Sequence, residues 1–287
     1  MQRYTFLYLM TICQVFLLNF WISQIFEFVL LKFKNTTMFA HLSKIIQETP
    51  KIDFSDLFNE SVLVYKKVWI QGILFQLLNF LIGMPLLFIN AEIFDLDQIE
   101  PTGDSLFFKM MNDDILLNNP LSDLGLWYFS LFITILLSIV LSFGFFRIVK
   151  RMDSGESFEF SDFFYFLSSD RLSKSILLML AYLGIAILAT LLCVLPLFYV
   201  MIPLLFVAPI FAYNADQLTV SETLKLSFQL GHKKWAITFI VTVLNGIMLY
   251  LITVFTCGLG SLIFGCFVQM PIYVIYKETF EANRISI

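Results

Sequence analysis

Four stretches of the chain lack Asp, Glu, Lys and Arg and are long enough to enter a membrane: 68–91, 124–146, 175–215 and 235–276. A helix needs about 20 apolar residues to cross the hydrocarbon core. The last two stretches are each about twice that length. Turn-forming residues interrupt both near the middle, at Leu195-Pro196 and at Cys257-Gly258-Leu259-Gly260. The pattern predicts two helical hairpins and two single helices, hence six spans at about 68–90, 125–147, 175–194, 197–214, 236–256 and 261–277.

A further uncharged stretch, 4–26, lies in a hydrophobic N-terminal extension, residues 1–37. It is too long for the apolar region of a signal peptide and has no small-residue cleavage site. Two interpretations stay open. The extension is an extra N-terminal span, or the start is assigned too early and the working protein begins at Met38. Residues 38–287 then form the six-span membrane domain.

Composition agrees with an all-α, polytopic membrane protein. The 287 residues are 59% hydrophobic and only 14% charged, and the mean hydropathy is +0.84. Soluble domains average about 25% charged residues. The net charge of −4 and the pI of about 5.2 argue against a nucleic-acid partner, which needs a basic surface.

The charges are unevenly distributed between the two sides of the predicted bundle. Segment 92–123 holds eight acidic residues and one basic residue, Lys109, and reads as an external acidic insertion. With the segments after the even-numbered spans in the cytoplasm, 16 of the 18 Lys and Arg residues lie on that side. Basic residues favour the cytoplasmic side. We therefore expect a multi-pass protein of the bacterial cytoplasmic (inner) membrane with a cytoplasmic C-terminus.

Three hexapeptides share one pattern: Asp53-Phe-Ser-Asp-Leu-Phe58, Glu159-Phe-Ser-Asp-Phe-Phe164 and Thr219-Val-Ser-Glu-Thr-Leu224. Each opens an amphipathic stretch that ends at a lysine and precedes a hydrophobic region. The pattern favours an internal repeat of three units, each an interfacial amphipathic helix plus a helical hairpin. The alternative is that the Ser and acidic residues have a purely structural role and only cap helices. The candidate contacts to anionic lipid are Lys66, Lys67, Lys174, Lys233 and Lys234.

Four prolines lie inside predicted spans and are candidate helix hinges. They are Pro85, Pro203, Pro209 and Pro271. Proline removes a backbone hydrogen bond and kinks a helix. Discontinuous helices form binding sites in transporters, although kinks that serve packing are the commoner case.

The stretch from the fourth to the fifth span carries a family resemblance. Its residues are Pro203, Pro209, Asn214, Glu222, Leu224, Ser227, Leu230, Gly231, Lys233 and Trp235. This pattern resembles a bacterial six-span membrane family of unknown function that includes the membrane domain fused to some glycerophosphoryl diester phosphodiesterases. The segment from Phe58 to Trp69 resembles the family's first unit, and the resemblance covers about 38–287. The phosphodiesterase domain is absent, so the resemblance implies a membrane module and no activity.

No sequence motif points to catalysis, a cofactor or a metal. The chain has two His and lacks GxSxG, HExxH, P-loop and GxGxxG patterns. The first hypothesis is a non-enzymatic module that organises membrane lipids or a membrane-protein partner, or assembles as a homo-oligomer. The second is a transporter or flippase-like protein for a lipidic or uncharged substrate. The third is a lipid-modifying enzyme, for which the only candidate groups are the Ser and acidic pairs Ser55/Asp56, Ser161/Asp162 and Ser221/Glu222.

Overall fold

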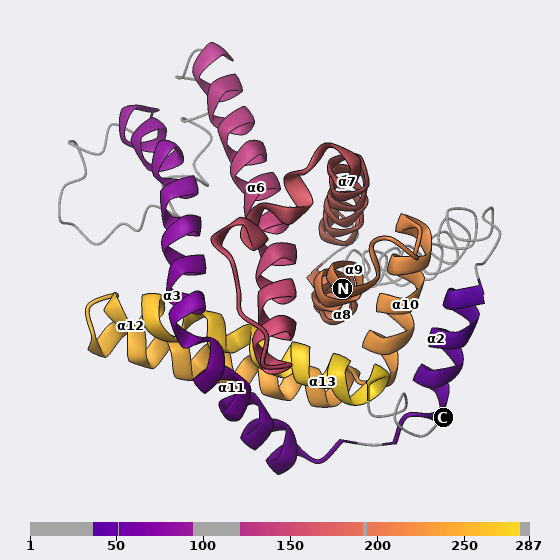
Figure 1. Cartoon of the computed structure of the whole chain (residues 1–287). Coiled ribbons are helices and arrows are strands. Elements are labelled where there is room, and N and C mark those ends of the chain that lie inside the picture. Colours follow the sequence, from indigo (N-terminus) through magenta and orange to yellow (C-terminus); the bar gives the residue numbers. More distant parts are fainter. Residues whose placement is uncertain (1–36, 51, 94–120, 192–193, 282–287) are drawn as a thin grey trace, which may run out of the picture. The chain divides into compact units, whose positions relative to one another are not determined.

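The computed structural model describes residues 37–50, 52–93, 121–191 and 194–281, and within these ranges every regular element is helical. The two interpretations of the N-terminal extension, and most of the acidic insertion, fall outside the described residues. Figure 1 shows the elements: α2 (Thr37–Glu48), α3 (Phe54–Ile93), α6 (Leu121–Asp153), η2 (Phe160–Leu167), α7 (Ser169–Leu191), α8 (Val194–Leu205), α9 (Val207–Asn214), α10 (Val220–Lys233), α11 (Trp235–Phe255), α12 (Leu259–Phe264), η3 (Gly265–Gln269) and α13 (Met270–Phe280).

The predicted all-α fold with six long apolar helical segments is confirmed. The candidate spans are Phe54–Pro85, Tyr128–Asp153, Arg171–Thr190, Pro196–Asn214, Trp235–Phe255 and Leu259–Phe280. Each overlaps one span expected from the sequence. Their surfaces carry many exposed large apolar side chains, including Phe80, Tyr250 and Phe255, as expected for helices that face lipid.

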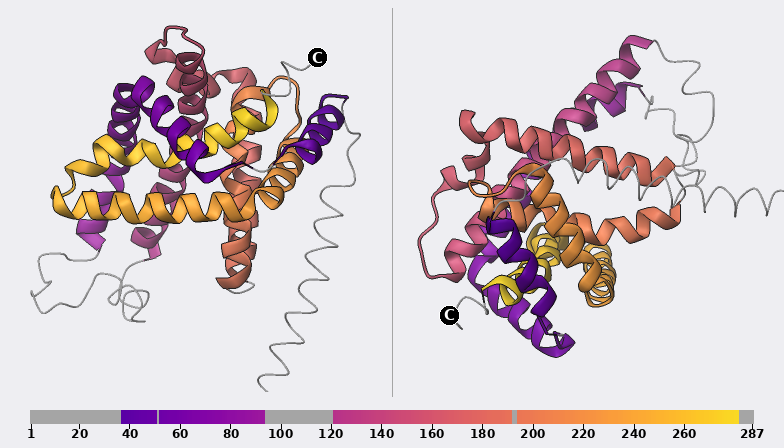
Figure 2. Two further views of the ribbon diagram at one scale, coloured as in Figure 1. Left: turned by 90° about the horizontal axis from the view of Figure 1, so that it is seen from below. Right: turned by 90° about the vertical axis from the view of Figure 1, so that its right-hand side faces the viewer.

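The second predicted hairpin break, at 257–260, coincides with a turn, whereas Leu195 and Pro196 of the first lie in the first turn of α8, a few residues after the end of α7. Helix α7 ends at Leu191 and α8 begins at Val194. Helix α11 ends in a Schellman motif, in which the N–H of Gly258 donates to the Thr253 carbonyl at 2.8 Å. Cys257 and Gly258 have φ values of +52° and +95°. This turn reverses the chain between α11 and α12 (Figure 2).

The three hexapeptides adopt different structures. The first opens α3, which continues without interruption from Phe54 to Ile93, so this hexapeptide does not begin a helix separate from the span. The second forms the 3-10 helix η2, and the third forms the N-terminus of the separate helix α10. Equivalence of the three units therefore stays a prediction.

By their contacts, the residues fall into two compact units. The first comprises the described parts of Met1–Leu63, Ser173–Ile247 and Val268–Ile287. In this unit α10 packs against α8, α9 and α2, and α13 packs against α2 and α9 (Figure 1). Gly231 of α10 lies directly against Pro203 of α8, where an added Cβ would come within 2.4 Å of the proline Cα. Absence of a side chain at this position lets the two helices approach closely.

The second unit comprises Val64–Leu172, where described, and Met248–Phe267. Here η2 returns along the C-terminal half of α6 (Figure 1). Gly144 permits this contact, since an added Cβ would come within 2.3 Å of the Phe163 carbonyl oxygen. Phe163 and Phe166 are fully buried, so one face of the short helix anchors it on α6.

The four prolines have different local effects. Pro85 lies inside α3, which continues past it, and Pro271 is the second residue of α13. Pro203 lies inside α8 and Pro209 inside α9, with a break at Phe206 between them. Pro209 cannot donate to the Leu205 carbonyl, and its ring crowds that group, which explains why α8 ends there. A hinge motion at any of the four stays a prediction.

Candidate functional site

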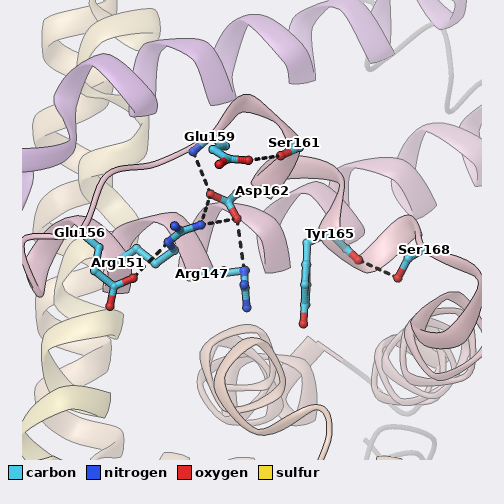
Figure 3. Close-up of polar contacts among 8 residues, drawn as sticks. All are labelled: Arg147, Arg151, Glu156, Glu159, Ser161, Asp162, Tyr165 and Ser168. Atoms are coloured by element: carbon cyan, nitrogen blue, oxygen red, sulfur yellow. Dashed lines mark hydrogen bonds and ion pairs between the residues drawn. The ribbon is translucent and has the colours of Figure 1, made fainter.

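A polar cluster joins the C-terminal end of α6 to η2 (Figure 3). Helix α6 ends in a second Schellman motif, with Gly155 at φ +80° and the N–H of Glu156 donating to the Arg151 carbonyl at 2.9 Å. Glycine adopts this left-handed conformation without steric cost. The reversal brings Asp162 of η2 back to the arginines of α6.

Asp162 is the centre of this cluster. Arg151 Nη1 lies 2.8 Å from Oδ1 and 2.6 Å from Oδ2 of the carboxylate. Arg147 Nε is 3.4 Å from Oδ1, and the backbone N–H of Glu159 donates to Oδ2 at 3.0 Å. Arg151 also pairs with Glu156, at 3.3 Å between Nε and Oε2. Figure 3 shows these contacts converging on the carboxylate.

The environment of Asp162 stabilises its ionised form. Burial alone raises the pKa of a carboxyl group. Here the hydrogen bond from the Glu159 backbone and the bonds and charge of Arg151 outweigh burial, and they hold the pKa of Asp162 below its ordinary value. The carboxylate is thus a structural anion that ties η2 to α6.

Two arginines lie over one aromatic ring next to this carboxylate. The guanidinium carbon of Arg147 lies 3.7 Å from the centroid of the Tyr165 ring, and that of Arg171 lies 4.3 Å from it. Cation–π contacts of this length are favourable. Tyr165 therefore holds together two cations that come from the ends of successive candidate spans.

The Ser and acidic residues of the hexapeptides have mainly capping roles where contacts are seen. Ser161 Oγ donates to Glu159 Oε2 at 3.2 Å. Glu222 Oε2 accepts from the backbone N–H and the hydroxyl of Thr219, at 2.9 and 2.8 Å, in a capping box. Ser55 N–H donates to Asp53 Oδ2 at 3.0 Å at the start of α3. The capping interpretation fits these contacts of Asp53 and Glu222.

Four of the five candidate lipid-binding lysines have intramolecular partners. Lys67 Nζ pairs with Asp153 Oδ1 at 2.6 Å, and Lys174 Nζ donates to the Ala215 carbonyl at 2.9 Å. Lys233 Nζ donates to the Ile46 carbonyl at 2.6 Å and also to Gln47, and Lys234 Nζ donates to Pro50. The fifth, Lys66, is exposed.

Lys233 thus caps the C-terminal end of α2, and Lys234 binds the chain just beyond it, at Pro50. Cations are favourable at the negative end of a helix dipole, and the last carbonyls of a helix lack intrahelical partners. Lys234 is 4% exposed. Burial, together with repulsion from Lys233, lowers the pKa of Lys234 below its usual value.

Several residues of the fourth-to-fifth-span pattern lie together between α8 and α10. Because Pro203 has no N–H, it leaves the Tyr199 carbonyl, four residues earlier, without its helical partner. The indole N–H of Trp235 donates to that carbonyl at 3.2 Å. Tyr199 Oη also lies 2.7 Å from His232 Nδ1. This group, with Gly231 against Pro203, fastens two helices together.

The sequence reasoning missed the arginine cluster. Arg147, Arg151 and Arg171 counted only toward the charge asymmetry, although the Asp-Ser-Gly-Glu turn at 153–156 could have indicated that the chain folds back on α6. Among the residues that the structure describes, no group of three or more His, Cys, Asp and Glu is placed to hold a metal ion.

Comparison of the chain with protein-family models, with curated proteins and with solved structures finds no match in any of the three. The six candidate spans agree with the span number of the family that the sequence resembles, but no family is assigned.

Proposed function

We propose that this polytopic membrane protein is a non-enzymatic module that organises anionic lipid or a partner protein. The observation that carries the proposal is that two of the three acidic residues available for lipid chemistry, Asp162 and Glu222, are already engaged in structural contacts. Asp162 is held by Arg151 and Arg147, and Glu222 is held in its capping box with Thr219. A general base or nucleophile needs an accessible group near a reacting bond, whereas Asp162 joins η2 to α6 and Glu222 caps α10.

The membrane and orientation belong to the same proposal. The distribution of Lys and Arg favours a bacterial cytoplasmic membrane with the C-terminus in the cytoplasm. Exposed apolar side chains along the candidate spans fit membrane lipids, a membrane-protein partner or a second copy of the chain. The acidic balance gives no reason to add a nucleic-acid partner.

A transporter or flippase-like role receives less support. It would use a cavity near Pro203 and Pro209 between broken helices. Both prolines are buried, and Pro203 lies against the backbone of Gly231. This close packing indicates that the prolines hold α8 against α10 and do not line a cavity for a substrate.

The test is the composition of the membrane patch around the protein. The full chain is extracted from cells with a membrane-solubilising polymer, without detergent, and its lipids and co-purifying proteins are compared with those of bulk membrane. We expect enrichment of an anionic phospholipid or a stoichiometric protein partner. Bulk lipid composition with no partner contradicts the proposal.

A second assay distinguishes a flippase-like transporter from a module that only organises the membrane. The purified chain is reconstituted in vesicles that carry a fluorescent phospholipid, and a membrane-impermeant reductant reports how much of it reaches the outer leaflet. Protein-dependent scrambling beyond the half accessible at the start would favour the flippase-like role. Unchanged accessibility is expected for a module.

A further inference from the structure

Arg147 has hydrogen-bonding capacity that the polar cluster leaves unused. A guanidinium has five N–H donors. Within the described part of the chain, Arg147 contacts a carboxylate through Nε, at 3.4 Å from Asp162, while Arg151 takes both oxygens of that group at shorter distances. The side chain is 32% exposed, and its two terminal nitrogens point away from Asp162 (Figure 3).

A second arginine adds positive charge next to Arg147, near the ends of two candidate spans. Arg171 lies over the same Tyr165 ring. Arg147 lies near the end of the candidate span Tyr128–Asp153, and Arg171 begins the next, Arg171–Thr190. Arg151, in contrast, is engaged by Asp162 and Glu156.

The short helix η2 that carries Tyr165 also exposes two phenylalanine rings. Phe160 is 53% exposed and Phe164 is 38% exposed, with their ring centroids 5.6 Å apart. Phe163 and Phe166 of the same helix are fully buried. Large exposed aromatics next to arginines are typical of segments that lie in the headgroup region of a bilayer.

We propose that Arg147, Arg171 and the exposed phenylalanine rings of η2 bind one anionic phospholipid. The terminal nitrogens of Arg147 hydrogen-bond its phosphodiester, the charge of Arg171 supports the same group, and Phe160 and Phe164 lie against its acyl chains. This site deepens the proposed function, on which it rests, by naming the lipid class and the residues. Planar guanidinium matches phosphate geometry, which a lysine does not reproduce.

The test measures lipid binding to the full chain purified in detergent, by native mass spectrometry. Phosphatidylglycerol and phosphatidylcholine with the same acyl chains are titrated separately. The main variant is Arg147→Gln, and Lys44→Gln is the matched control, because it removes one exposed cation elsewhere that is not among the candidate lipid contacts. Arg147→Lys keeps the charge and removes the planar fork.

For the native chain we expect tighter binding of phosphatidylglycerol than of phosphatidylcholine. Arg147→Gln weakens phosphatidylglycerol binding about tenfold, because a charge-assisted hydrogen bond is lost. Arg147→Lys gives an intermediate affinity, and Lys44→Gln stays within about twofold of the native chain. Arg151 still holds Asp162 in both Arg147 variants, and if Arg147→Gln unfolds, Arg147→Lys alone decides the test.

Equal binding by Arg147→Gln and the native chain would overturn the site while leaving the proposed function standing. If the native chain shows no preference for phosphatidylglycerol, both the Arg147 site and the proposal that the protein organises anionic lipid are wrong. Inorganic phosphate in excess, added with phosphatidylglycerol, should displace little lipid. Full displacement would assign the site to a free anion and overturn the phospholipid proposal.

Discussion

Arg151 Nη1 contacts both carboxylate oxygens of Asp162, at 2.8 and 2.6 Å, and so joins η2 to α6 across a turn of the chain. The side chain of Asp162 is 7% exposed. A buried carboxylate with several charge-assisted donors is costly to replace, because its partners lose their acceptor.

Replacement of Asp162 by Asn should therefore loosen η2. We expect Asp162→Asn to destabilise the fold by about 2 kcal/mol, the scale of a hydrogen bond to a charged group. Thermal unfolding of the purified protein in detergent measures the effect. Asp56→Asn removes an exposed carboxylate and is the control. Equal stability of Asp162→Asn and the native chain would show that Phe163 and Phe166 alone hold η2.

The same carboxylate gives a pH dependence with a definite sign. The pKa of Asp162 is lower in the folded protein than in the unfolded chain, so its contribution to stability is present in full above the unfolded pKa. The contribution is lost as the pH falls from about 4 through the folded pKa. Melting curves at falling pH should show a decline for the native chain that is smaller in Asp162→Asn. Parallel declines in the two proteins would assign acid sensitivity to other groups.

Because α8 and α10 are in close contact, a methyl group added at their interface should destabilise the protein, whereas one added elsewhere should not. Gly231→Ala should cost about 1–3 kcal/mol, because its Cβ would overlap Pro203. Gly246→Ala is the matched control, because it lies in α11 with no atom within 4 Å of the added Cβ. That control should be neutral or stabilising by up to about 1 kcal/mol, since alanine favours helix more than glycine does. Chemical or thermal unfolding compares the two.

Hydrogen exchange of the backbone amides can measure how far the lysines stabilise the last turn of α2. The double variant Lys233→Ala/Lys234→Ala leaves the carbonyls of Ile46 and Pro50 without these donors. We expect amide exchange in the last turn of α2 to accelerate about tenfold or more, as the helix end frays. Lys44→Ala, an exposed lysine on α2 itself, should leave exchange in that turn nearly unchanged. Unchanged exchange in the double variant would favour lipid as the main partner of these lysines.

The proposed orientation can be tested at Cys257. This thiol is free and exposed in the turn between α11 and α12, which the charge distribution assigns to the outside. In a chain with Cys13, Cys193 and Cys266 changed to Ser, a membrane-impermeant maleimide should label Cys257 in intact cells. Moving the single cysteine to Ser154, which is exposed between the second and third spans, should abolish labelling until the cells are opened. The reverse pattern would invert the topology.

Span positions and hairpin breaks were predictable because each depends on residues next to one another in the sequence. Uncharged runs mark the spans, Gly258 marks one turn, and Pro196 lies a few residues after the end of α7. The partners of Lys233 and Lys234 were not predictable, because they lie 187 and 184 residues away along the chain. A lysine at the end of an amphipathic stretch looks the same whether it faces a headgroup or a distant helix end.

The arginine cluster was less predictable than the spans but more predictable than the partners of the two lysines. Asp162 is 11 residues from Arg151 and 15 from Arg147, so a single turn at Gly155 connects them. The hexapeptide pattern drew attention to Asp162 as a cap for its own helix. Its stronger partners lie on the preceding helix, and only the direction of the turn reveals them.

The long reach of Lys233 and Lys234 also determines the order in which the chain can assemble. Synthesis proceeds from the N-terminus, so the carbonyls of Ile46 and Pro50 are made long before the lysines that bind them. The Pro203–Gly231 contact, by comparison, closes a short loop and can form soon after α10 emerges. Docking of α2 is therefore a late event, and a nascent chain stopped before α10 is complete exposes an α2 whose final turn has no lysine to hold it.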